Sequence, residues 1–78
     1  MFQIMFPNGT TYRELLKAQR RGHRVVVFVN EVATQAKVSN LQDKEGGAHQ
    51  VVECWVTLDF SCDFVKIMVR CHLPLGAS

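Results

Sequence analysis

The residues of this 78-residue chain that could bind a metal ion are three cysteines and one histidine: Cys54, Cys62, Cys71 and His72. Structural zinc sites typically take cysteine pairs separated by about two to four residues, and the sequence contains no such pair. Cys71 and His72 are adjacent in a segment that alternates like a strand, so their side chains should point to opposite faces. We therefore predict no bound metal and no cofactor, with a zinc-stabilised domain as a distant alternative.

Nucleophilic catalysis would need a cysteine or serine beside a base, with hydrogen-bond donors for an oxyanion. Cys62, in a predicted turn, is the only thiol expected to be exposed, and nothing in the sequence brings His23 or His49 to it. Cys54 and Cys71 share the parity of the buried face, where a reduced cysteine behaves as a small hydrophobic residue. The chain is also too short to wall a sizeable pocket. We predict that the protein is not an enzyme.

Basic residues are concentrated in the first 30 positions, which hold five of them against one acid, whereas residues 31–78 hold four against six acids. Such a local field attracts anionic partners whatever the net charge of +2. The candidates for binding nucleic acid, or a protein with an acidic surface, are Arg13, Lys17, Arg20, Arg21 and Arg24. In a helix, Arg13, Lys17 and Arg20 would form a ridge, with Arg21 adjoining. A solvated helix face is the alternative.

A second candidate site lies on residues 50–73, which read as two strands, about 50–60 and 63–73, because apolar residues alternate along both. One parity is apolar and should face the core. The other parity mixes charges with large apolar side chains, a composition typical of interfaces, and supplies the predicted contact residues Trp55, Met68, Phe64, Arg70 and Val51. Cover by the protein's own loops or chain ends is the alternative.

The turn between these strands decides which side chains are neighbours. A two-residue turn would place Trp55 beside Met68 and Glu53 beside Arg70. A four-residue turn would place Trp55 beside Arg70 and Asp59 beside Lys66. The four-residue turn would also oppose Cys54 and Cys71, making a disulfide conceivable; we expect reduced thiols.

The first half of the chain should supply a strand, a helix and a second strand. Alternating apolar residues predict a strand over about 2–6, which Pro7-Asn8-Gly9 ends in a turn. Thr11 and Glu14 form a capping box, and Gly22 suits a C-terminal cap, so a helix is expected over about 11–21. The run Val25–Val29 predicts a strand over about 24–30, covered on both faces. Residues 31–38 favour an extension of this strand to 38, continuous or with a kink or bulge near Asn30-Glu31, and a helix capped by Asn30 is the alternative. Residues 39–49 read as a polar loop.

These elements predict an α+β fold of one domain, residues 1–78, with the order β-α-β-β-β and one helix on a mainly antiparallel sheet. A hydrophobic fraction of 47% and a charged fraction of 21% are those of an ordinary globular chain. A chain this short buries only about 60% of its unfolded surface, and one helix cannot cover both faces of the sheet. We therefore expect a non-enzymatic interaction module that forms a homodimer through the outer sheet face or a strand edge.

The compartment and the partners are expected from absences in the sequence. No apolar run approaches the roughly 18 residues that cross a bilayer, so no membrane association is predicted. There is no signal-peptide pattern, and three cysteines make an odd number, so a cytoplasmic location is expected. The size and economy of the chain suggest an inhibitor or adaptor of the phage type, by analogy alone. Nucleic-acid binding through the basic helix is the alternative function.

Overall fold

The computed structural model describes residues 3–45, 49–60 and 63–76. Helix α1 spans Tyr12–Arg21, as the sequence predicts. The Thr11 hydroxyl oxygen accepts a hydrogen bond from the Glu14 N–H at 3.2 Å, which is one half of the expected capping box. Gly22 ends the helix at φ 68°, a left-handed conformation that glycine adopts without steric cost.

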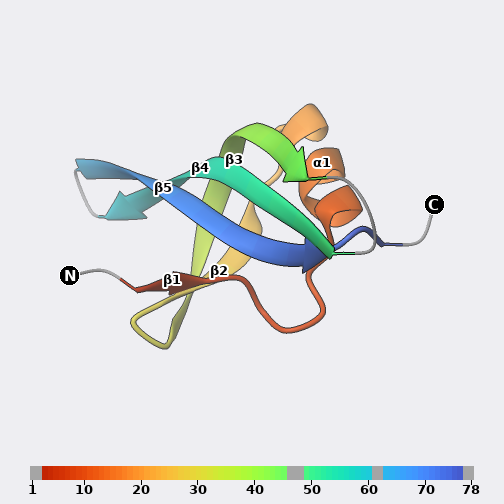
Figure 1. The fold of residues 1–78 in the computed structure, drawn as a ribbon. Coiled ribbons are helices and arrows are strands. Elements are labelled where there is room, and N and C mark those ends of the chain that lie inside the picture. The colour runs from red at the N-terminus through yellow and green to blue at the C-terminus, as the bar shows by residue number, and fades with distance from the viewer. Residues whose placement is uncertain (1–2, 46–48, 61–62, 77–78) are drawn as a thin grey trace.

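In the described part of the chain, five antiparallel strands lie in the sheet in chain order, one more than the sequence predicts (Figure 1). Each strand pairs with the next one along the chain, and the helix comes between the first two. The strands are β1 (Ile4–Met5), β2 (Val25–Val29), β3 (Val32–Glu45), β4 (His49–Phe60) and β5 (Asp63–Pro74).

The additional strand arises at Asn30 and Glu31, where we expected a continuous or kinked strand. Both residues have positive φ, 47° and 71°, and they connect the paired residues Val29 and Val32. Two positive φ values define the tight turn whose twist matches that of a β-hairpin. The chain therefore reverses here. The prediction that the strand from 24 to 30 could run on to 38 is therefore wrong. The sequence does not reveal the turn, because Glu31 occupies a position where glycine would normally signal one.

The prediction of a polar loop is also wrong for Ser39–Glu45, which belong to β3. Between the pairs Ser39–Trp55 and Gln42–Glu53, β3 has one residue more than β4, so the strand contains a bulge. Asn40 has a φ of 51°, which an asparagine tolerates better than most residues. The extra residue breaks the alternation of side chains, so the sequence pattern does not read as a strand.

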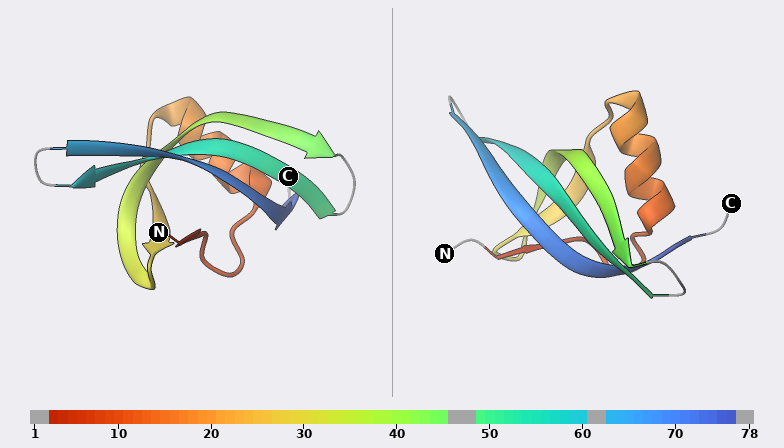
Figure 2. Two further views of the ribbon diagram at one scale, coloured as in Figure 1. Left: turned by 60° about the vertical axis from the view of Figure 1, so that its left-hand side comes forward. Right: turned by 45° about the horizontal axis from the view of Figure 1, so that its top comes forward.

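Strand β3 bends the sheet because its two halves pair with different neighbours. Ala36 pairs with Val25 of β2 and also with Leu58 of β4. The residues before Ala36 pair with β2, and the pairings with β4 begin at Ala36 and continue beyond it. The result is a strongly curved, nearly closed barrel-like sheet with α1 along one side (Figure 2).

The core lies inside this curve, where α1 contacts β3 and contributes the fully buried Leu15. Strand β4 contributes one parity to it, as the sequence predicts. The largest fully buried side chains are Leu15, Leu58, Val27, Val52, Val56 and Cys54. Strand β2 differs from expectation: Val26 is 41% exposed and Phe28 is 36% exposed. The predicted cover on both faces of β2 is thus wrong, because the outer face of a barrel has no second layer.

Candidate functional site

The connection between β4 and β5 has the two-residue register, because Phe60 pairs with Asp63. Trp55 therefore lies opposite Met68, and Glu53 lies opposite Arg70. The Glu53 carboxylate is 3.7 Å from Arg70 and 3.9 Å from Lys44. Ion pairs this long and this exposed contribute little to stability.

The residues predicted to form an interface differ in their accessibility. Phe64 is 73% exposed and Met68 is 48% exposed, and Arg70 is also exposed. Trp55 is half-buried, with the Lys66 ammonium 5.2 Å from the centre of its ring. Val51, expected beside them, is instead buried at 6% exposure. The apolar surface available at this end of the sheet is therefore supplied by Phe64 and Met68.

Strand β5 has 12 residues and lies at the edge of the sheet. It pairs with β4 on one side and, among the described residues, with no strand on the other. The short strand β1 comes near its second half, and grooves of about 200 and 310 Å³ separate the two. The first half of β5 lies in an arm that projects from the barrel (Figure 1). Its backbone groups are thus accessible to another strand.

The structure places the five basic residues predicted to act together in different surroundings. Lys17, Arg21 and Arg24 line a cleft between α1 and the start of β2. Arg20 is exposed but does not line this cleft. Arg13 is half-buried; its backbone N–H donates to the Leu75 carbonyl at 3.1 Å, and its Nε has no acceptor among the described residues. The helical spacing keeps Arg13, Lys17 and Arg20 on one side of α1, and of these three only Lys17 lines the cleft.

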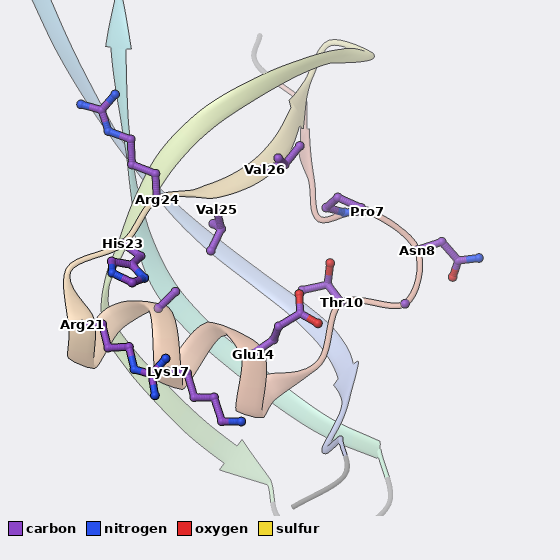
Figure 3. A pocket seen from close by; sticks show the side chains of 12 residues that line it. Pro7, Asn8, Thr10, Glu14, Lys17, Arg21, His23, Arg24, Val25 and Val26 are labelled. Atoms are coloured by element: carbon purple, nitrogen blue, oxygen red, sulfur yellow. The ribbon is translucent and has the colours of Figure 1, made fainter.

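The cleft has a volume of about 530 Å³, which is larger than we expected of so short a chain. The turn from Pro7 to Thr10 closes one end of it, held by a hydrogen bond from the Thr10 N–H to the Pro7 carbonyl at 3.0 Å. Figure 3 shows Glu14 directed toward Thr10, and it shows Arg24 directed away from the helix. The Arg24 guanidinium lies 3.9 Å from the Asp59 carboxylate.

The cysteines form no catalytic or metal-binding group in the described part of the chain. Cys54 is buried and Cys71 is half-buried, and both are free thiols. Burial raises the pKa of Cys54 to about 12, and the neighbouring Cys71 adds to the shift. Burial likewise raises the pKa of Cys71. Thiols that hold their protons are poor nucleophiles and poor metal ligands. Cys62, the predicted exposed thiol, lies outside the described residues.

Sequence reasoning missed a second exposed apolar area, near β1 and the β2–β3 turn. Met5 is 57% exposed and lies opposite Phe28, and Val32 is 64% exposed. A groove of about 370 Å³ lies beside Met5 and Phe28. The signal was present in the run Val25–Val29, which we interpreted as a strand buried on both faces.

The three sets of residues therefore lie in different places: the edge and outer face of β5, the cleft beside α1, and the buried thiols. Within residues 3–45, 49–60 and 63–76, no helix has the length and apolar character needed to cross a membrane. Within the same ranges, no group of three or more His, Cys, Asp or Glu side chains could hold a metal ion. No protein-family model, curated protein or solved structure matches the chain.

Proposed function

We propose that this protein is a small, non-enzymatic interaction module that forms a homodimer through the edge and outer face of β5. In this proposal it presents its basic residues to a larger partner with an acidic surface. The observation that carries the proposal is the unpaired edge of β5, on which Phe64 is 73% exposed. A strand edge offers hydrogen bonds, and an exposed aromatic residue offers apolar area, to the same partner.

Edge pairing fits residues 63–66 of β5 better than the rest of the strand. Alternate residues of an antiparallel strand direct their N–H and C=O groups away from the strand already paired. From Ile67 onward, β1 lies across a groove of about 310 Å³ that Ile67 and Met68 line. Residues 63–66 do not line that groove or the neighbouring one. A second copy can therefore approach this segment without displacing β1.

The charges on the outer face restrict the register of such a pair. A two-fold axis through Lys66 would place the two Lys66 ammonium groups opposite each other, which is unfavourable. An axis through Val65, which has inward parity, would place Phe64 of each copy beside Lys66 of the other. An ammonium over an aromatic ring is attractive, by about 0.5–1 kcal/mol at exposed sites. We therefore favour the pairing centred on Val65.

Light scattering on wild-type protein and on Phe64→Glu tests this proposal. Phe64 is so exposed that the substitution should leave the fold intact, and the wild type should have twice the mass of the variant at tens of micromolar. Val32→Glu is the matched control, since Val32 is 64% exposed on β3, which lies between β2 and β4 and is not part of the β5 edge, so this variant should remain dimeric. A monomeric wild type, or a dimeric Phe64→Glu, would contradict the proposal.

Nucleic-acid binding is the second candidate, and a specific observation favours it. Lys17, Arg20 and Arg21 form no salt bridge with any described residue, so their charges are available to phosphates. Binding to single-stranded and double-stranded oligonucleotides should weaken as salt increases, and neutralising these three residues should reduce the slope. Binding that is absent, or insensitive to salt, would eliminate this candidate.

A further inference from the structure

We infer that the cleft between α1 and β2 is a binding site for a small phosphate monoester on a hydroxyl-rich skeleton, such as a sugar phosphate or nucleotide. This goes beyond self-association, because the cleft and the free edge of β5 are formed by different residues. Its volume of about 530 Å³ is within the range of small-molecule sites, roughly 300–1,000 Å³.

The phosphate would be held by Lys17 and Arg21. They stand four residues apart on α1, so they lie on the same side of the helix, as Figure 3 shows. Neither forms a salt bridge with a described residue. A guanidinium offers two parallel N–H donors to phosphate oxygens, and an ammonium adds a point charge. His23, at the end of the helix, supplies a further ring nitrogen to the same cleft.

The rest of the ligand is indicated by the opposite end and the floor of the cleft. The Glu14 carboxylate faces Thr10 and has no hydrogen-bond donor among the described residues (Figure 3). An ionised carboxylate only accepts hydrogen bonds, so it favours a hydroxyl or amino group and opposes a second phosphate. Ala18 and Val25 provide an apolar floor. A sugar ring has hydroxyl groups at its rim and C–H groups on its faces, which suits this combination.

A concave site also separates this inference from nucleic-acid binding. Arg13 and Arg20 lie outside the cleft, and the Arg24 guanidinium is directed away from the helix toward Asp59 (Figure 3). Within the cleft, the helix therefore supplies two cations, Lys17 and Arg21, one turn apart. This arrangement suits one phosphate group, whereas a strand of nucleic acid needs a track of positive charge.

Calorimetric titration with ribose 5-phosphate, AMP, ribose and inorganic phosphate tests the inference. Ribose 5-phosphate should bind at least about tenfold more tightly than ribose, because the charged contacts are lost with the phosphate. It should also bind more tightly than inorganic phosphate. The AMP arm distinguishes a free sugar phosphate from a nucleotide as the natural source. Equal affinity for ribose 5-phosphate and inorganic phosphate, or no binding at millimolar concentrations, would overturn the assignment.

Variants locate the site. Lys17→Gln with Arg21→Gln should weaken ribose 5-phosphate at least about tenfold, whereas the matched pair Arg20→Gln with Lys37→Gln, which removes the same charge from exposed positions outside the cleft, should have little effect. Glu14→Ala should reduce the preference for ribose 5-phosphate over inorganic phosphate. The inference would be overturned if the two double variants lost equal affinity for ribose 5-phosphate, or if an oligonucleotide bound more tightly than AMP. The titrations are repeated on Phe64→Glu, so that failure of the dimer and failure of the cleft are distinguished.

Discussion

The side-chain oxygen of Gln19 accepts a hydrogen bond from the backbone N–H of Leu41 at a distance of 2.9 Å. The two residues are 22 positions apart, and the bond joins α1 to the bulge of β3. A bulge leaves a residue without its usual partner in the neighbouring strand. Gln19 supplies the missing acceptor, and so fixes the helix that forms one wall of the cleft.

Removing this acceptor should destabilise the domain. We expect Gln19→Leu to lower the free energy of unfolding by about 1–2 kcal/mol, because the half-buried Leu41 N–H loses its partner. Gln19→Glu keeps an acceptor oxygen and should retain most of the stability. Urea denaturation measures both variants. If Gln19→Leu is as stable as the wild type, the bond does not hold the helix to β3.

The turn at Asn30 and Glu31 should be improved by glycine. Glu31 has a φ of 71°, which costs a residue with a Cβ roughly 1–2 kcal/mol and costs glycine nothing sterically. We expect Glu31→Gly to stabilise the protein by about 1 kcal/mol, raising Tm by about 4–8 °C. Glu31→Ala removes the same carboxylate and keeps the Cβ, so its Tm should change little. A Tm for Glu31→Gly at or below that of Glu31→Ala would count against this turn conformation.

Stability should fall at alkaline pH because of Cys54. The folded thiol keeps its proton up to a pKa of about 12, whereas the unfolded thiol loses it near 9.0. The stabilising contribution is thus complete below pH 9.0 and is lost as the pH rises toward 12.

Comparison with Cys54→Val isolates this effect from that of other titrating groups. Between about pH 8 and pH 10, the free energy of unfolding of the wild type should fall by about 1 kcal/mol more than that of the variant. Chemical denaturation under reducing conditions provides the measurement. Parallel pH profiles for the two proteins would mean that the Cys54 thiol is not shielded from water.

Much of the β4–β5 hairpin and the helix could be predicted from the sequence, because each follows from a local pattern. The alternation along residues 50–60 and 63–73 has no interruption. It left a two-residue and a four-residue turn open, and the pairing of Phe60 with Asp63 selects the two-residue turn. The limits of α1 follow from Thr11 and Gly22, which are adjacent to the helix that they cap.

Features that depend on curvature could not be predicted in this way. The bulge at Asn40 shifts the side-chain pattern of β3 by one residue, and Glu31 gives no sign of a turn. Val26 and Phe28 read as buried because nothing local indicates that the sheet curls and leaves its outer face uncovered. The basic residues could be named, but the division between Lys17 and Arg20 depends on how β2 and the turn at Pro7 pack beside the helix.

Amide hydrogen exchange along β5, measured residue by residue at low and high protein concentration, tests self-association most directly. If a second copy pairs with this edge, the amides of residues 63–66 that do not bond to β4 should exchange more slowly as concentration increases, and those of β2 should not change. Rates along β5 that are independent of concentration, in a range where light scattering detects a dimer, would place the contact elsewhere and contradict the proposal.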